Sequence, residues 1–327
     1  MKTIKKIMSL MLVVAVVFSF TACGSSEEEA SNNLVIRYQK SIAYAPVIVM
    51  AEKNMIANYY DGDINVDCQV EKDGNNIKEG VSAGSIDIGT LGLPPAVIGE
   101  LSGGKYKIFT AIASQPYSIV TNDKEMKTLK DLKDNNVQIA LVNPNSQGHI
   151  LLTMAAKAEL GDAHAFDNQL NSVDNASGFD GIKSGAIKCH VVISPYNFKE
   201  LAVEGTHEIP VSEDVWVPGD TSIVGIASEK LYNENKDLYD AVCKALEEAM
   251  TYVKENPEET AQLVKEKLEL DDSVEDIVSY MTNEKSTFST ELQGVGNFVN
   301  YMKEEGFLEY DYSGNLSDII YDGVKGN

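Results

Sequence analysis

The chain has 327 residues, of which 27 are lysine or arginine and 50 are aspartate or glutamate, so its formal net charge at pH 7 is −23. This acidic balance repels a phosphate backbone and argues against nucleic acid as a partner. A chain of this length usually divides into more than one domain, each with its own hydrophobic core. No Pro/Gly/Ser-rich linker follows residue 33. We therefore expect two domains joined by structured crossings rather than by a flexible tether.

The first residues are typical of an export signal. Three lysines precede the apolar run 7–20, which is too short for a secure transmembrane span, and two residues separate this run from Cys23. The segment resembles a bacterial lipoprotein signal, in which Cys23 is lipidated and becomes the first mature residue. We expect residues 1–23 to be the signal, residues 24–33 a polar tether, and the mature protein to be extracytoplasmic and lipid-anchored to the bacterial cell membrane. An ordinary cleaved signal with an incidental cysteine is the alternative.

The next stretch alternates short apolar strands with helices. The patterns predict strands at 34–38, 64–70, 86–89 and 106–114, and helices at 45–53, 75–83 and 96–101. Pro46 stands in the first turn of the first helix, and Pro94-Pro95 open the third, where a missing N–H does no harm. Residues 117–121 are expected to cross into a second lobe.

The second half continues this alternation. Thr128 and Asp131 have capping-box spacing at the start of a short helix, and Gly161 ends a helix over 149–160. Further strands are expected at 137–142, 187–193, 209–216 and 223–227, the last returning the chain to the first lobe. From Lys236 onward the pattern is helical, with a core-facing stripe of Leu238, Val242, Leu246, Met250 and Val253.

Alternating strands and helices predict α/β lobes with mostly parallel strand order. We assign residues 34–116 and 222–327 to lobe one and residues 117–221 to lobe two. Two segments then cross between the lobes, and two crossings form a hinge rather than a free joint.

A near-repeat indicates that the lobes are built alike, because residues 80–87 (GVSAGSID) recur as residues 181–188 (GIKSGAIK). In each copy the residues are typical of the end of a helix, followed by a glycine in the left-handed conformation and then by a short apolar strand. The strands lead into Thr90-Leu91-Gly92 and Ser194-Pro195-Tyr196, which we expect to be polar turns. Open α/β sheets bind ligands at the carboxyl ends of their strands, so two facing turns would form a cleft. A chance match between Gly-rich helices is the alternative.

Several motifs together carry a family resemblance; they lie at residues 36–40, 83–90, 129–133, 145–146, 184–187 and 195–196. The chain is similar to the extracytoplasmic solute-binding proteins of ABC importers, in the nitrate, sulfonate and taurine group that also includes thiamine-pyrimidine binders. The resemblance implies a periplasmic-binding-protein-like fold of type II, with two α/β lobes joined by two crossover strands. It also implies a monomer without a cofactor, which captures a small-molecule ligand and delivers it to an ABC permease served by a separate ATPase subunit.

The candidate ligand-binding residues follow from the polar loops. Arg37 is the only arginine and lies within a strand, so an anion would be held by helix-start N–H groups, hydroxyls and amides, with Lys40 as the one well-placed cation. The strand, polar turn and helix start around residues 137–149 present such N–H groups. The candidates are Lys40, Ser41, Tyr44, Thr90, Gly92, Gln115, Tyr117, Asn145, Ser146, Gln147, His149, Ser194 and Tyr196.

The identity of the ligand stays open among several small polar solutes. Sulfonate binders of this family often have an aromatic-acidic pair before the proline, whereas Ile193-Ser194 precede Pro195 here. An amine-bearing ligand such as taurine thereby loses a carboxylate partner, which favours an aliphatic sulfonate or a nitrate-like anion. Three tyrosines, Tyr44, Tyr117 and Tyr196, could instead stack on a pyrimidine-like ring. Trp216 could line the cleft, although a core position is the better expectation.

Two other classes of protein are the alternatives to an importer component. An enzyme is disfavoured because the four histidines lack metal-ligand spacing and no nucleophile, phosphate-loop or zinc motif is present, so we expect neither a metal nor a cofactor. A ligand-presenting receptor for a separate sensor protein is the other alternative. Cys68, Cys189 and Cys243 are odd in number and far apart, which favours buried thiols and leaves one disulfide open.

Overall fold

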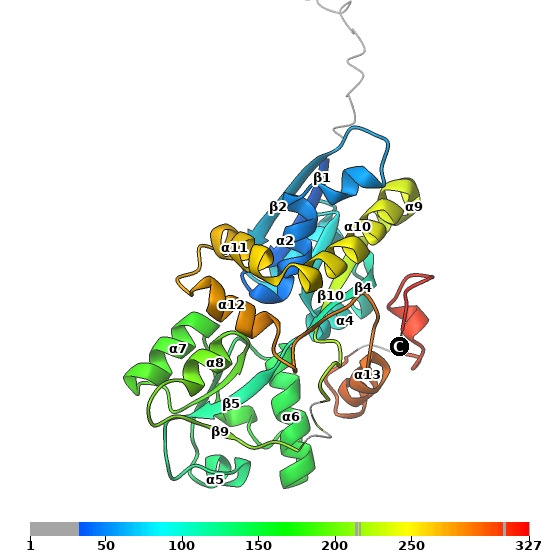
Figure 1. Cartoon of the computed structure of the whole chain (residues 1–327). Coiled ribbons are helices and arrows are strands. Elements are labelled where there is room, and N and C mark those ends of the chain that lie inside the picture. Colours follow the sequence, from blue (N-terminus) through cyan, green and yellow to red (C-terminus); the bar gives the residue numbers. More distant parts are fainter. Residues whose placement is uncertain (1–32, 213–214, 216, 310–311, 327) are drawn as a thin grey trace, which may run out of the picture.

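The computed structural model describes residues 33–212, 215, 217–309 and 312–326. The export signal, Cys23 and Trp216 therefore lie outside the described residues. Figure 1 shows two α/β bodies. One is built around a six-stranded sheet and the other around a five-stranded sheet. This architecture confirms the predicted fold class. In the described part of the chain, no helix combines the length and the apolar character needed to cross a membrane.

Lobe one is built on a mixed sheet with the strand order β11-β4-β10-β3-β1-β2. Its strands are β1 (Asn33–Gln39), β2 (Asn65–Glu71), β3 (Ile88–Gly92), β4 (Tyr106–Ser114), β10 (Ile223–Ser228) and β11 (Thr287–Phe288). β1 runs parallel to β2 and β3, whereas β10 is antiparallel to β3 and β4. The sheet therefore joins strands from before and after the second lobe.

Helices cover this sheet on both faces (Figure 1). They are α2 (Ala45–Glu52), α3 (Gly74–Ala83), α4 (Leu93–Leu101), α9 (Glu229–Glu234), α10 (Lys236–Glu255), α11 (Pro257–Leu268), α12 (Val274–Met281) and α13 (Val295–Glu304), with the 3-10 turns η1 (Ile42–Tyr44), η2 (Met55–Asn58) and η4 (Leu316–Asp318). The predicted apolar stripe of α10 packs against α2 and η2, with Leu238, Val242, Leu246 and Val253 buried and Met250 partly buried.

Lobe two has the strand order β7-β6-β8-β5-β9. Its strands are β5 (Tyr117–Thr121), β6 (Ile139–Leu141), β7 (Leu170–Ser172), β8 (Cys189–Ile193) and β9 (His207–Ile209), and its helices are α5 (Leu129–Asp134), α6 (Gln147–Leu160), α7 (Asn175–Ser184) and α8 (Tyr196–Leu201), with the turn η3 (Asp167–Gln169). The predicted capping box of Thr128 and Asp131 starts α5, and Gly161 ends α6 in the left-handed conformation.

Three sequence predictions about strands are wrong. The order is mixed rather than mostly parallel, because β5 and β10, at the crossings between lobes, pair antiparallel with both of their neighbours. The strand predicted at 209–216 ends at Ile209, because Pro210 has no N–H to donate to a ladder. Residues 90–92 are the end of β3 and not a turn.

The near-repeat is a structural repeat. α3 and α7 each follow an aspartate N-cap, Asp73 and Asp174, and each ends at a left-handed glycine, Gly84 at φ 78° and Gly185 at φ 79°. One turn earlier, a Cβ on Gly80 or Gly181 would lie 2.4 Å from the Cδ1 atom of Ile86 or Ile187, respectively. The repeated glycines therefore let each helix pack closely on the chain that leads into β3 or β8.

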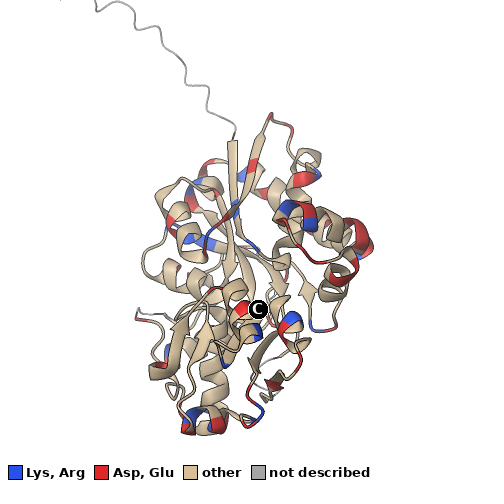
Figure 2. Cartoon of the chain, turned by 90° about the vertical axis from the view of Figure 1, so that its left-hand side faces the viewer, with Lys and Arg blue, Asp and Glu red and all other residues tan. Residues whose placement is uncertain are grey.

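The C-terminal segment contacts lobe two in two places. Phe198 of α8 stacks on Tyr280 of α12 with ring centroids 5.3 Å apart, and Lys199 forms a 2.6 Å ion pair with Asp272. On the other side, the Tyr301 hydroxyl of α13 donates to the Thr153 hydroxyl of α6 at 3.0 Å. Figure 2 shows acidic and basic residues spread over both lobes. The exact boundaries assigned to the lobes stay a prediction.

Candidate ligand-binding cleft

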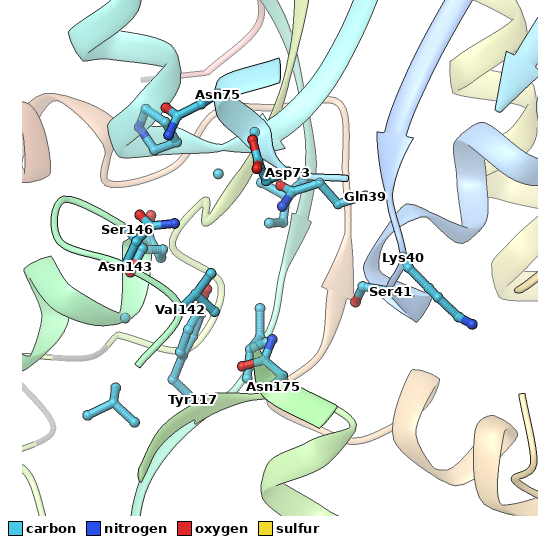
Figure 3. A pocket seen from close by; sticks show the side chains of 18 of the residues that line it. Gln39, Lys40, Ser41, Asp73, Asn75, Tyr117, Val142, Asn143, Ser146 and Asn175 are labelled. Atoms are coloured by element: carbon cyan, nitrogen blue, oxygen red, sulfur yellow. The ribbon is translucent and has the colours of Figure 1, made fainter. Parts of the chain in front are cut away.

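A cavity of about 130 Å³ lies between the two lobes. Its polar wall consists of Gln39, Lys40, Ser41, Tyr44, Asp73, Asn75, Tyr117, Asn143, Ser146, Gln147 and Asn175, and its remaining wall of Gly74, Gly92, Pro95, Val142, Gly148, Val191, Ile193 and Ile223. Figure 3 shows labelled side chains of both lobes arranged around this space. The volume is below the roughly 300 Å³ at which pockets for drug-sized ligands begin, so it fits a small solute.

Four helices begin at this cavity. α3 starts after Asp73, α4 after Gly92, α6 after Ser146 and α7 after Asp174, and each contributes a cavity-lining residue at or next to its first turn. Helix N-termini carry partial positive charge and free N–H groups, which favour an anionic or hydrogen-bond-accepting group.

The four helix starts differ in the donors they can offer. In α4, Leu93 already donates its N–H to the Ser222 carbonyl at 3.0 Å, and the next two residues are prolines without an N–H. In α6, the Ser146 hydroxyl accepts from the His149 N–H at 3.3 Å. The N–H groups of Gln147 and Gly148 then have no acceptor among the described residues. α3 begins in the same way, but its cap is the Asp73 carboxylate, whereas the Ser146 cap of α6 is neutral, so the start of α6 suits an anion better.

The loop after β1 supplies hydroxyl and amide groups. The Tyr44 hydroxyl donates to Gln39 Oε1 at 3.0 Å, which leaves the Gln39 amide NH₂ as a donor. Ser41 caps η1 by accepting the Ala43 N–H at 3.2 Å. Burial raises the pKa of Tyr44 and of Tyr117, so both phenols are neutral at physiological pH.

Charge in the cavity wall is scarce. Among the described lining residues, Lys40 and Asp73 carry charged side chains. Lys40 is exposed, and Figure 3 shows its amine pointing away from the other side chains. Arg37 pairs with Asp67 at 2.7 Å on the edge strand β2 and lowers the pKa of that carboxyl group. The cleft therefore has no cation directed into it from the described residues.

Two carboxamides of lobe two that line the cavity have unpaired oxygens. Gln147 is 6% exposed, and its Oε1 has no hydrogen-bond partner among the described residues. The same holds for Oδ1 of Asn175 at the start of α7. Leaving such a group unpaired costs about 1–3 kcal/mol, and a donor on a bound solute would satisfy it.

The model of the NMT1-like family matches residues 27–266, which is most of the chain. The chain belongs to the NMT1-like family. A search of curated proteins finds no match. Family membership agrees with the motifs that indicated an ABC-importer solute-binding protein.

Solved structures similar to this NMT1-like protein share its fold. The aliphatic sulphonate-binding protein SsuA from Escherichia coli is 18% identical, with a TM-score of 0.69 over 90% of this chain and 93% of the other. The nitrate-binding protein NrtA from Synechocystis PCC 6803 is 16% identical, with a TM-score of 0.73 over 90% and 87%. SsuA from Xanthomonas axonopodis, bound to MOPS, is 14% identical, with a TM-score of 0.69 over 89% and 98%. The fold is thus that of periplasmic binding proteins.

Seven of the thirteen sequence candidates line the cavity. They are Lys40, Ser41, Tyr44, Gly92, Tyr117, Ser146 and Gln147. Lys40 lines it with its stem rather than with its charge (Figure 3). The role of each in ligand binding stays a prediction.

The other six candidates lie outside the cavity wall. Thr90 is fully buried in β3, where its hydroxyl donates to the Arg37 carbonyl at 3.4 Å. Asn145 and His149 bond to each other, with the Asn145 N–H donating to the His149 ring at 3.0 Å. Burial lowers the pKa of this histidine.

The remaining three lie deeper or to one side. Gln115 and Ser194 are fully buried at the first crossing, where the Ser194 N–H donates to the Pro116 carbonyl and both side chains have unpaired oxygens. Tyr196 starts α8 and packs against Phe179 instead of the cavity. The turn at 194–196 therefore supports the wall without lining it.

Sequence reasoning missed five polar residues of the cavity wall: Gln39, Asp73, Asn75, Asn143 and Asn175. A signal for two of them was present, because the structural repeat continues toward the N-terminus. Asp73 and Asp174 precede the repeated helices at the same spacing, so the starts of α3 and α7 could have been placed opposite each other.

Titratable side chains also lie outside the cavity wall. All three described cysteines are free, Cys189 buried and the other two partly buried. His190 and Glu200 form a fully buried pair at 2.7 Å inside lobe two. Among the described residues, no group of three or more histidine, cysteine, aspartate or glutamate side chains is placed to hold a metal ion.

Proposed function

We propose that this NMT1-like protein is the solute-binding component of an ABC importer, which captures one small polar solute between its lobes and delivers it to a permease. The observation that carries this proposal is the small cavity at the lobe junction, walled by polar side chains and helix starts from both lobes. A ligand that contacts both lobes binds the closed arrangement more tightly than the open one, and so shifts the balance toward closure.

The first test is a thermal-shift screen of the protein from residue 31 onward. Its panel contains alkylsulfonates, aminosulfonates, small amino acids and carboxylic acids, nitrate and hydroxymethylpyrimidine. A ligand present at a hundred times its Kd raises the unfolding free energy by about 2.7 kcal/mol, which shifts the melting temperature measurably. A hit accompanied by a more compact X-ray scattering profile supports the proposal. A hit with no change in scattering contradicts capture by closure.

An oxyanion of the ligand would be held at the start of α6. The Gln147 and Gly148 N–H groups supply its donors, and the Gln39 amide and nearby hydroxyls complete the set. Sulfonate and nitrate are the ligands of the structurally similar proteins SsuA and NrtA, and both have such oxygens.

A pyrimidine-like ring is the second candidate ligand. Tyr44 and Tyr117, on opposite lobes, both line the cavity and could contact the faces of a flat ring. Stabilisation by hydroxymethylpyrimidine alone in the same screen would favour this ligand over an acid.

Membrane attachment is proposed to occur through a lipid on Cys23. In a bacterial host, Cys23→Ala should move the protein from the membrane fraction to the soluble extracytoplasmic fraction, because the acyl anchor is lost. Ser25→Ala serves as a control that keeps the cysteine. Retention of the Cys23→Ala variant in washed membranes would contradict lipid anchoring.

A further inference from the structure

The cleft contains one charge whose position was not expected from the sequence. The Asp73 carboxylate stands at the cavity wall on lobe one, whereas the Lys40 amine points away and Arg37 is paired with Asp67 (Figure 3). Ile193-Ser194 lack a carboxylate on lobe two, but Asp73 supplies one from the opposite lobe. The net charge directed into the cavity by the described residues is therefore negative.

The helix N-termini at the cavity differ in how well each could bind an anion beside the negative charge of Asp73. At α3, the Asp73 Oδ1 itself accepts the Asn76 N–H at 2.9 Å, so an anion that approached this helix start would meet a carboxylate. The start of α4 has no free N–H, since Leu93 is paired and prolines follow. The free N–H groups of Gln147 and Gly148 lie across the cavity in lobe two. The wall of lobe one thus carries a negative charge, whereas the start of α6 in lobe two has a neutral cap and two free N–H groups.

We infer that the solute carries a protonated amine that pairs with Asp73, as well as an acidic group that binds at the start of α6. This inference rests on the proposed capture of a solute and narrows it to small zwitterions, the class of amino acids and aminosulfonates. An unaminated anion would be enclosed beside a carboxylate with no compensating cation from the described residues, which is unfavourable in a desolvated site. A zwitterion satisfies both walls at once.

The test uses pairs of probes that differ in one amine: taurine against ethanesulfonate, and β-alanine against propionate, measured by calorimetric titration. The wild type should bind the aminated member of at least one pair about 10- to 100-fold more tightly, as expected for a hydrogen bond to a charged group. Asp73→Asn removes the charge but keeps an efficient N-cap, so α3 should still form. This variant should lose the preference and bind the unaminated member more tightly than the wild type does.

The matched control is Asp174→Asn. Asp174 caps α7 by accepting the Ser177 N–H at 3.0 Å, as Asp73 caps α3, but it does not line the cavity. This variant should keep the wild-type preference. If Asp73 had only a structural role, Asp73→Asn would bind both probes of a pair more weakly. If Asp73 pairs with the amine, the variant binds the aminated probe more weakly and the unaminated probe more tightly.

The outcomes separate this inference from the proposed function. If the wild type binds ethanesulfonate or propionate as tightly as its aminated partner, or if Asp73→Asn keeps the preference, the inference is overturned while solute capture stands. If none of the four probes binds, the wider thermal-shift panel decides: stabilisation only by solutes without an amine overturns the inference, and stabilisation by no solute contradicts solute capture.

Discussion

At the residue scale, single polar groups have two roles in this cleft. Ser146 is both the N-cap of α6 and part of the cavity wall, and Asp73 has the same pair of roles at α3. A substitution at such a position changes the stability of the helix and the binding of the solute together. Matched controls at caps outside the cavity separate the two effects.

Ser146→Ala should lower the unfolding free energy by about 1 kcal/mol, because the His149 N–H loses its acceptor. It should also weaken solute binding, since it loosens the turn that presents the Gln147 and Gly148 N–H groups. Denaturant unfolding and calorimetric titration measure the two effects. Ser228→Ala, which removes the cap of α9 in lobe one away from the cavity, should lower stability alone. Equal solute affinity in all three proteins would contradict the assignment of the cleft.

Glu100 should make stability depend on pH. Burial raises the pKa of this carboxyl group from 4.5 to about 7, with Lys107 opposing the rise and Asp318 and Glu229 adding to it. Because the folded state binds this proton more tightly than the unfolded chain does, the contribution is complete below about pH 4.5 and is lost as the pH rises through about 7.

Glu100→Gln should therefore flatten the fall in unfolding free energy between pH 4.5 and 8. Urea unfolding at several pH values measures this slope, and the exposed Glu255→Gln serves as the control. Identical pH profiles for the wild type and Glu100→Gln would contradict the role of Glu100.

At the element scale, the structural repeat sets two helices and their glycine ends in equivalent places. Gly84 after α3 and Gly185 after α7 both adopt the left-handed conformation, and a Cβ on either would meet no atom within 4 Å. The conformational cost of a side chain is thus isolated from any clash at both sites.

Gly84→Ala and Gly185→Ala should each lower the unfolding free energy by about 1 kcal/mol, because an L-residue disfavours this conformation. Asparagine at the same positions should cost less, since it tolerates positive φ better. Denaturant titrations of the four variants measure these values. A cost at one helix and none at its counterpart would show that the two halves of the repeat are not energetically equivalent.

At the scale of the whole molecule, contacts between α8 and the segment around α12 hold the lobes together on one side of the cleft. The Phe198 and Tyr280 rings are nearly parallel, at 3°, and the nearby Lys199–Asp272 pair has side chains that are 23% and 8% exposed. These contacts join lobe two to the C-terminal third of the chain. We expect them to favour the closed arrangement.

Tyr280→Ala should remove roughly 0.5–1.5 kcal/mol of stacking and shift the lobes toward the open state. The expected result is a larger radius of gyration in X-ray scattering and weaker solute binding. Tyr232→Ala breaks a comparable stack with Tyr321 inside lobe one, at 4.0 Å, and should lower stability without changing the scattering profile. Unchanged scattering in Tyr280→Ala would contradict a role for this stack in closure.

The sequence by itself determined most of the secondary structure and the two-lobed α/β class. Local signals act over a few residues: the capping box of Thr128 and Asp131, the left-handed glycines at 84, 161 and 185, and the apolar stripe of α10 were all readable and are confirmed. The strand over 209–216 was misjudged, because apolar alternation outweighed the proline at its start. The exact lobe boundaries and the lipid anchor stay predictions.

The tertiary structure alone decided which polar groups form the cleft. Leu93 cannot donate to a ligand because its N–H bonds to the carbonyl of Ser222, a partner far along the chain that no local pattern reveals. Asp73 and Gln147 line the same cavity, from opposite sides, only because crossing strands bring the two lobes together. Local propensity fixes where a helix begins, but the charge and free donors at a binding site depend on long-range packing, which a single sequence does not encode in any local window.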